Sequence, residues 1–397
     1  PHVALRTTRI SASLGRTEDA ARKLNEAAEK FPDSPDLARA RGDLALQTGR
    51  YGEAQAQYEE ALKKAPDDLA TRFSLAQTLR KMRRFDEAVA VLDAVAKVDK
   101  NYPGLSLERG LYYEETGQTD QALAMYNDAL QRAPEDVDLK LRVGSTLVAA
   151  GQAKQAEAVL KDVIRERANS AEANHFYGRA LLLAGSNLNE AMRHLKNAID
   201  LDGNRAEYHL YVGWAANEAG QPQVAGSSLE RAIELDSSLG DAYWQRGILL
   251  QKQGRTTDAI ADLQLALEKR PSRYEAYATL ALCYEEQNNW PKADETWRKA
   301  IEGNDKIPDW HFRLGKLLTR RNDGKNAVLE LEKAIELGAN REPRPGWLPE
   351  AHFLLGDLLR ASDKEKAVLH YQAFLRLAPP DNAYRKDAED AVGRLKR

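Results

Sequence analysis

The most constraining feature of this sequence is a short phrase that recurs every 34 residues. Four copies read "YGEAQAQYEEALKKAP" (51–66), "FDEAVAVLDAVAKVD" (85–99), "TDQALAMYNDALQRAP" (119–134) and "TTDAIADLQLALEKRP" (256–271). Their leading alanines, and those of the related copies, fall in two evenly spaced series: Ala54, Ala88, Ala122 and Ala156, then Ala225, Ala259, Ala293 and Ala327. Repetition of this length is typical of solenoid proteins, in which each unit stacks on the next.

Each repeat is predicted to contain two amphipathic helices. In the first helix, apolar residues stand at the fourth, seventh, eighth and eleventh positions, as at Tyr277, Leu280, Ala281 and Tyr284, which is helical spacing. A turn such as Gly117–Gln118 follows, because glycine accepts the left-handed conformation that ends a helix. The second helix often ends at a proline. Small residues at the eighth and twentieth positions are expected to let the two helices approach closely.

The composition limits the classes of function. With 58 basic and 61 acidic residues, the net charge of −3 supplies no overall attraction for nucleic acid. No run of 18 apolar residues is present, so we expect no direct membrane insertion of this chain. The lone Cys283 excludes an internal disulfide framework. It fits the cytoplasm, and it equally fits a periplasm in which nothing needs bridging, so both localisations stay open.

The period, the helix–turn–helix units and the G…Y…A…F…P pattern resemble the tetratricopeptide-repeat (TPR) family. The resemblance covers nearly the whole chain and implies an all-α, right-handed α-solenoid of about eleven repeats over residues 1–381. The repeats are predicted to begin near residues 1, 35, 69, 103, 137, 171, 206, 240, 274, 308 and 349. A C-terminal capping helix is predicted over 382–397. No comparable cap precedes the first repeat, so we expect further repeats or a partner upstream of residue 1.

No catalytic or cofactor motif is present in the sequence, whether a phosphate-binding loop, G-x-S-x-G, H-E-x-x-H or CxxC. His209, His311 and His352 take a position where the family has a core aromatic residue, so we expect structural roles and no metal. Cys283 occupies a repeat position that is usually alanine, which predicts that its side chain is buried in the core. The basic run "RKMRR" (80–84) ends a helix, where solvated positive charge is favourable. We therefore expect no enzyme, metal or cofactor.

The resemblance also implies a concave wall made by the first helices, with the fifth and ninth positions facing a groove. The predicted groove residues are apolar: Leu107, Leu111, Leu141, Leu210, Trp214, Trp244, Ile248, Leu282 and Phe312. Such a groove fits an amphipathic helix or an extended apolar segment of another protein, with aromatic anchors. Trp244 fits packing against the adjoining repeat equally well, whereas a tryptophan at the ninth position, Trp214, favours binding. The lysine, asparagine and arginine set with which some relatives clamp a terminal carboxylate is missing.

One stretch, "NREPRPGWLPEAHF", interrupts the repeats. Comparing "PDWHFRLG" at 308–315 with "PEAHFLLG" at 349–356 shows that seven residues, 342–348, are inserted between two complete repeats. Insertions of this kind often belong to the binding face, which makes Arg344 and Trp347 candidate contacts in an edge loop. The alternative, which we favour for Trp347, is a plug that covers the joint between the repeats.

The function that these features predict is a non-enzymatic scaffold for protein–protein interaction. Its alanine-rich repeats resemble TPR proteins of bacterial secretion, pilus-assembly and exopolysaccharide-export systems. One alternative is the targeting arm of an enzyme such as an O-linked N-acetylglucosaminyltransferase, although the asparagine ladder of those arms is missing here. Another is a scaffold that self-associates through the uncapped first repeat.

Overall fold

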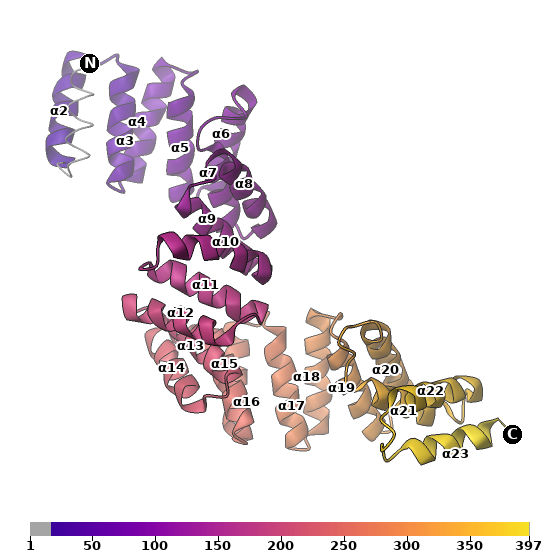
Figure 1. The fold of residues 1–397 in the computed structure, drawn as a ribbon. Helices are drawn as coiled ribbons and strands as arrows, with labels where there is room; N and C mark the ends of the chain where they lie inside the picture. The colour runs from indigo at the N-terminus through magenta and orange to yellow at the C-terminus, as the bar shows by residue number, and fades with distance from the viewer. Residues whose placement is uncertain (1–16, 397) are drawn as a thin grey trace. The chain divides into compact units, whose positions relative to one another are not determined.

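The computed structural model describes residues 17–396, and α-helix is the regular secondary structure throughout that range (Figure 1). The all-α prediction is therefore confirmed. Residues 1–16 of the first repeat, the repeat named in the self-association alternative, lie outside the described residues. The chain divides into two compact units, Pro1–Asn187 and Leu188–Arg397, and each is described by itself.

The first unit contains ten described helices. They are α2 (Thr17–Lys30), α3 (Pro35–Gln47), α4 (Tyr51–Lys64), α5 (Leu69–Lys81), α6 (Phe85–Val98), α7 (Leu105–Glu115), α8 (Thr119–Arg132), α9 (Val137–Ala149), α10 (Ala153–Glu166) and α11 (Ala171–Ala184). The helices α3, α5, α9 and α11 begin where the sequence places repeats two, three, five and six. Helix α7 begins two residues later than its predicted repeat, because Gly104 precedes it with a φ of 81°.

The second unit contains twelve described helices. They are α12 (Leu188–Leu201), α13 (Ala206–Glu218), α14 (Pro222–Leu235), α15 (Gly240–Lys252), α16 (Thr256–Lys269), α17 (Tyr274–Glu286), α18 (Trp290–Gly303), α19 (Pro308–Arg320), α20 (Gly324–Gly338), α21 (Leu348–Leu359), α22 (Lys364–Leu377) and α23 (Arg385–Leu395). Helix α23 packs on α22 and buries Ala388. It occupies the place of the predicted capping helix.

Small residues bring the two helices of a repeat together, as predicted. A Cβ atom added to Gly42 in α3 would lie 2.5 Å from Tyr58 Cε1 in α4. In the next repeat but one, a Cβ on Gly110 would lie 2.4 Å from Tyr126 Cε1. Both tyrosine rings are fully buried. The glycine at the eighth position is therefore required by the ring that packs on it.

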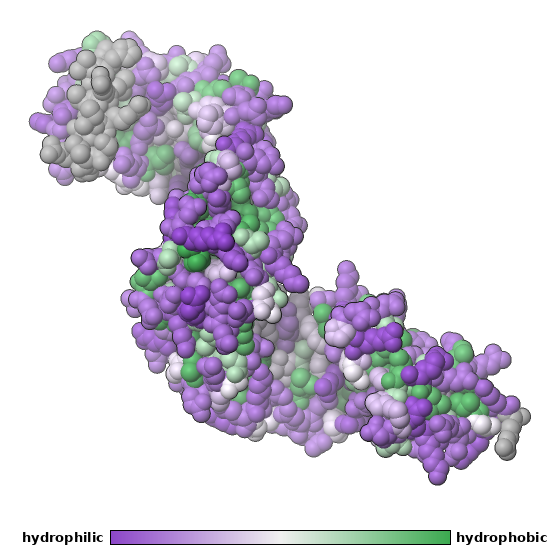
Figure 2. Space-filling model, viewed as in Figure 1, coloured by the Kyte–Doolittle hydropathy of each residue, from purple (hydrophilic) through white to green (hydrophobic). Residues whose placement is uncertain are grey.

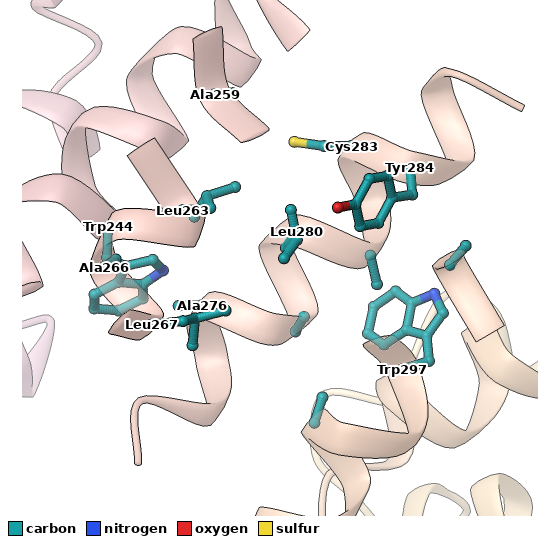
Figure 3. Close-up of a cluster of buried hydrophobic side chains, with 14 of the residues drawn as sticks. Trp244, Ala259, Leu263, Ala266, Leu267, Ala276, Leu280, Cys283, Tyr284 and Trp297 are labelled. Carbon is teal, nitrogen blue, oxygen red and sulfur yellow. The ribbon is translucent and has the colours of Figure 1, made fainter. Parts of the chain in front are cut away.

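Stacking of successive repeats builds the core of the second unit (Figure 3). Leu263 from α16, Leu280 from α17 and Trp297 from α18 belong to one buried cluster, together with Cys283. Burying a leucine or a comparable side chain contributes about 1.5–3 kcal/mol. A single repeat cannot enclose these side chains alone, so its neighbours stabilise it. The predicted burial of Cys283 is confirmed.

Candidate interaction surface

The first helices of successive repeats form one wall of each unit. Contacts join α3 to α5, α5 to α7 and α9 to α11 in the first unit, and α13 to α15, α15 to α17 and α19 to α21 in the second. The predicted groove residues all lie on these first helices. On the face shown in Figure 2, the surface is mostly hydrophilic, and hydrophobic residues form small patches. A binding surface must therefore be sought among individual side chains on the wall.

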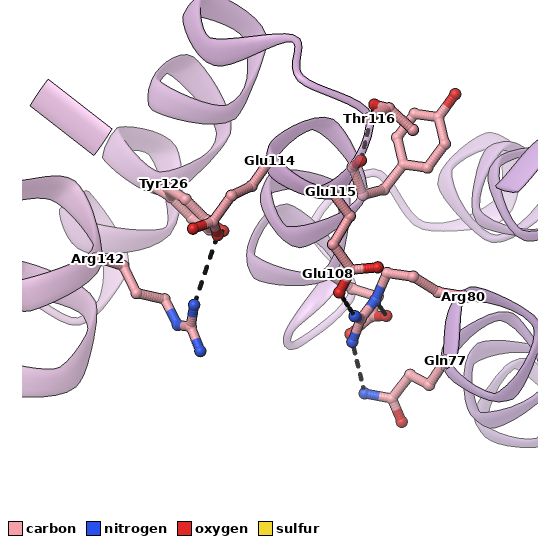
Figure 4. A network of polar contacts seen from close by, with 9 residues as sticks. Gln77, Arg80, Glu108, Glu114, Glu115, Thr116, Tyr126 and Arg142 are labelled. Carbon is pink, nitrogen blue, oxygen red and sulfur yellow. Dashed lines mark hydrogen bonds and ion pairs between the residues drawn. The ribbon is translucent and has the colours of Figure 1, made fainter. Parts of the chain in front are cut away.

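In the first unit, the predicted groove residues lie on α7 and α9. Leu107 and Leu111 are half-buried, and Leu141 is buried. A buried ion pair lies beside them between α5 and α7 (Figure 4). Arg80 is 4% exposed and its Nε donates to Oε1 of Glu108, which is 3% exposed, at 2.5 Å. Arg80 also pairs with Glu115 through Nη1.

The prediction of a solvated basic run at 80–84 is therefore wrong for Arg80. Burial opposes the charge of Arg80, but its hydrogen bonds and attraction to Glu108 and Glu115 outweigh that effect and raise its pKa. Lys81 and Arg83 are exposed, as expected. The error arose because both carboxylates belong to the next repeat, which a helix-end argument does not consider.

In the second unit, three ninth-position residues form what we call the apolar stripe: Trp214 on α13, Ile248 on α15 and Leu282 on α17. All three are half-buried and pack against the same buried cluster. Trp214 stacks on Tyr211, with ring centroids 5.7 Å apart and planes 14° from parallel. Its ring also meets Trp244 edge-on at 5.4 Å. The aromatic packing holds Trp214 in one orientation while leaving part of it at the surface.

Leu210 and Trp244, at fifth positions, lie deeper than the stripe. Leu210 is buried, and Trp244 is 7% exposed. The Nε1 of Trp244 donates to Thr279 Oγ1 at 3.4 Å, and the guanidinium of Arg273 lies 4.8 Å from its ring. Thr279 belongs to the next repeat, and Arg273 lies at the boundary just before it. Trp244 is thus placed in the joint between repeats, as the packing alternative describes, and it supports the more exposed Trp214.

The acidic residues at the second positions of α15 and α17, two helices that carry the stripe, are already paired within the chain. Asp241 accepts hydrogen bonds from Arg273 Nε at 2.8 Å and Nη2 at 2.6 Å. Oε2 of Glu275 lies 3.6 Å from Nη1 of the same arginine. For Arg273, burial opposes the charge, but pairing with Asp241 outweighs it and raises its pKa. These acidic side chains are engaged within the chain, so the stripe presents mainly apolar surface.

The tenth repeat carries the inserted loop. Phe312, the last predicted groove residue, is 4% exposed because Trp347 stacks on it, with centroids 4.9 Å apart and planes 12° from parallel. The indole Nε1 of Trp347 donates to Asp309 Oδ1 at 2.8 Å. Trp347 is half-buried and covers the joint, whereas Arg344 is exposed.

The histidines serve packing and pairing. Nδ1 of the buried His311 lies 2.7 Å from Glu330 Oε2, and its Nε2 lies 2.9 Å from the backbone oxygen of Asp305. Nδ1 of His352 lies 3.0 Å from Nδ1 of His370. Across residues 17–396, no group of three or more histidine, cysteine, aspartate or glutamate side chains is arranged to hold a metal ion.

Several residues of this surface were missed from the sequence: Tyr211, Arg273 and Asp309. Tyr211 stands three residues before Trp214, a spacing that places both rings on one helix face. That signal was available. Arg273 lies just before α17, at a position that the repeat pattern does not link to the groove.

Paired helices that stack through first-helix contacts define an α-helical repeat protein. Tetratricopeptide-repeat family models match residues 45–105, 114–180 and 250–311, and also residues 12–69, which together make up more than half of the chain. The chain belongs to the tetratricopeptide-repeat family. TPR proteins generally mediate protein–protein interaction, and their fold is typically a non-enzymatic scaffold.

Curated and solved proteins agree with this family. The E3 ubiquitin-protein ligase CHIP of Arabidopsis thaliana is 34% identical over 70 residues, which are 18% of this chain and 25% of that protein's length. The Cut9–Hcn1 hetero-tetramer of the APC/C matches with a TM-score of 0.55 and 14% identity, over 99% of this chain and 83% of that chain.

Two other solved structures are similar in fold. A human IFIT1 dimer with m7Gppp-AAAA matches with a TM-score of 0.52 and 16% identity, over 83% of this chain and 81% of that chain. PilF of Pseudomonas aeruginosa matches with a TM-score of 0.50 and 20% identity, over 57% of this chain and 99% of that chain. Within the described residues, no helix is long and apolar enough to cross a membrane.

Proposed function

We propose that this chain is a non-enzymatic scaffold that binds a helix or an extended peptide of another protein along the apolar stripe. The observation that supports this is the state of Trp214. Its ring is oriented by Tyr211 and Trp244, yet the side chain is only half-buried on the wall of first helices. A rigid aromatic side chain that is partly exposed loses little conformational entropy on binding, which is typical of an interaction hot spot.

The chemistry of the flanks favours an apolar partner over a charged one. Asp241 on α15 and Glu275 on α17 are both paired with Arg273 of the chain itself. A charged partner could pair with these carboxylates only after their present ion pairs had been broken. Breaking those pairs costs free energy that the new contacts would first have to offset. The half-buried faces of Ile248 and Leu282 carry no such penalty. Apolar residues of the partner are therefore expected to face the stripe.

The test is a crosslinked capture from the source cell with wild type, Trp214→Ala and Leu329→Ala. Leu329 is the matched control, because it is 56% exposed and lies on a second helix, α20. A partner that uses the stripe should lose about 2 kcal/mol, or ~30-fold in affinity, with Trp214→Ala. It should bind Leu329→Ala like wild type. Circular dichroism must show equal helix content in all three proteins.

An unchanged affinity of every captured partner for Trp214→Ala would refute binding at the stripe. We further propose that the scaffold acts in a bacterial secretion, pilus or exopolysaccharide-export assembly, on the basis of the resemblance of its alanine-rich repeats. The identities of the captured partners test this assignment separately from the test of the stripe.

A further inference from the structure

The apolar stripe runs across three first helices and then ends. Trp214, Ile248 and Leu282 take equivalent positions on α13, α15 and α17, whereas the same position of α19 is Lys316, which pairs with Glu350 at 2.7 Å. Neighbouring first helices are in contact, and the axes of packed helices lie about 8–10 Å apart. A segment that covers the stripe must therefore present three apolar side chains at about this interval.

Two regular backbone conformations provide that interval. In an α-helix, seven residues span about 10.5 Å and return the side chain to nearly the same face. In a polyproline II helix, three residues span about 9 Å and complete one turn. A β-strand does not fit, because its side chains alternate between faces and those on one face lie only about 7 Å apart. The spacing leaves an α-helix and a polyproline II segment as the two candidates.

The polar groups beside the stripe distinguish the two candidates, because these groups are already engaged within the chain. Thr279 accepts a hydrogen bond from Trp244 Nε1 at 3.4 Å, and its hydroxyl donates to the backbone oxygen of Glu275 at 3.0 Å. Gln251 Nε2 donates to Oε1 of Glu286 at 2.6 Å. The backbone groups that a polyproline II segment turned towards the stripe would lose water without gaining these partners, which is unfavourable. An α-helix pairs its backbone groups internally, so the wall favours a helix.

The charges beside the stripe differ from one end to the other. Glu207 stands seven residues before Trp214 and Glu218 four residues after it, so all three share one face of α13. Both carboxylates are exposed, and neither forms an ion pair with any residue in the range 17–396. On α15, the residue equivalent to Glu218 is the exposed Lys252. Positive charge on the partner is therefore favourable over α13 and unfavourable over α15.

We propose that the segment that covers the apolar stripe is an amphipathic helix of about four turns, whose large apolar residues stand about seven apart. One apolar residue lies over each of Trp214, Ile248 and Leu282, and basic residues flank the one that lies over Trp214. These opposite charges fix which end of the helix lies over α13, because charge complementarity sets the register of an interface. The inference rests on the proposed function, since it specifies the partner of the same stripe.

The test is a selection from random peptides displayed on phage, each about 18 residues long so that it can form four helical turns. The library is first depleted on Trp214→Ala and then selected on wild type. Enriched sequences should carry large apolar residues about seven apart, with lysine or arginine near one end. A synthetic peptide from this pool should bind Glu207→Lys/Glu218→Lys about tenfold more weakly than wild type at low salt. The control, Glu268→Lys/Glu302→Lys, makes the same charge change at exposed positions of the second helices α16 and α18, and should bind like wild type.

The other outcomes separate failure of the helix from failure of the stripe. Enriched sequences with proline and with apolar residues at about every third position would refute the helix and leave the stripe as a binding site. Selection of no sequence that depends on Trp214 would refute binding at the stripe, and with it the proposed function. A wild-type dimer in light scattering that Trp214→Ala abolishes would assign the stripe to a second copy of the chain. If Trp214→Ala loses helix content in circular dichroism, Ile248→Gln replaces it in the depletion step.

Discussion

The buried pair of Arg80 and Glu108 provides the sharpest test of what holds the first unit together. The two side chains link α5 to α7 across a joint between repeats, and both are almost fully buried. The variant Glu108→Ala removes the acceptor of Arg80 Nε and also the acceptor of Gln77. A guanidinium then remains in the joint, with Glu115 as the carboxylate that still pairs with it.

The expected magnitude follows from this geometry. Removing one partner of a buried ion pair costs about 3–5 kcal/mol, because the remaining charge is desolvated without compensation. Glu115 still holds one edge of Arg80, so we expect the lower end, about 3 kcal/mol. The double variant Arg80→Met/Glu108→Leu removes both desolvation costs along with the attraction. It should lie within about 1 kcal/mol of wild type, because apolar pairs often replace buried ion pairs without loss.

Urea unfolding with two probes separates the units. All six tryptophans lie between Trp214 and Trp347, so tryptophan fluorescence reports the second unit, whereas far-UV circular dichroism reports all helices. Because stability in a repeat array is the sum of local terms, Glu108→Ala should shift the circular dichroism transition much more than the fluorescence transition. A loss below about 1 kcal/mol, or a double variant as unstable as Glu108→Ala, would refute the conclusion that a buried charge pair controls this joint.

Two further predictions concern titration and reactivity. Burial, with the nearby charges of His370 and Arg376, lowers the pKa of His352 to about 4. Free histidine titrates near 6.5, so the stabilising contribution of neutral His352 is complete above pH 6.5 and is lost as the pH falls towards 4. Wild type should therefore lose more melting temperature between pH 7 and pH 5 than His352→Gln, and equal losses would contradict this. Burial also raises the pKa of the Cys283 thiol to about 12, so Ellman's reagent at pH 8 should label it only after unfolding; rapid labelling of native protein would show that its joint opens.

Much of the fold was predictable because the information lies inside each repeat. The apolar positions that pair two helices recur at a constant spacing, and the turn between them carries its own signal. Gly117 adopts a φ of 75° there, as expected. Where the glycine is replaced, Arg83, Asn288 and Asn322 adopt the same left-handed conformation, with φ of 60°, 56° and 61°. Asparagine accepts this conformation more readily than other residues with a side chain, whereas arginine does not, so packing of the repeat imposes the turn even on Arg83.

The surface was harder to predict because its contacts run between repeats. The burial of Trp244 depends on Thr279 in the following repeat and on Arg273 at its boundary. The burial of Arg80 depends in the same way on Glu108. A comparison of the repeats position by position identifies only the contacts that all repeats share. The contacts of Trp244 and Arg80 occur at one joint each, so this comparison does not find them. The sequence signal that could have predicted such ion pairs was the presence of opposite charges separated by about one repeat length.

The difference between contacts within a repeat and contacts between repeats also indicates where binding can influence the chain. The two helices of a repeat are held together by residues that the family pattern requires. The first helices of neighbouring repeats are held together by contacts that differ from one joint to the next. Trp214 on α13 touches Trp244 on α15, which in turn is held by residues of the next repeat. A partner that covers Trp214 therefore adds contacts across a joint and not within a repeat. Since neighbouring repeats stabilise one another through such joints, binding at the stripe should stiffen the wall from α13 to α17 while leaving the helix pairs as they are.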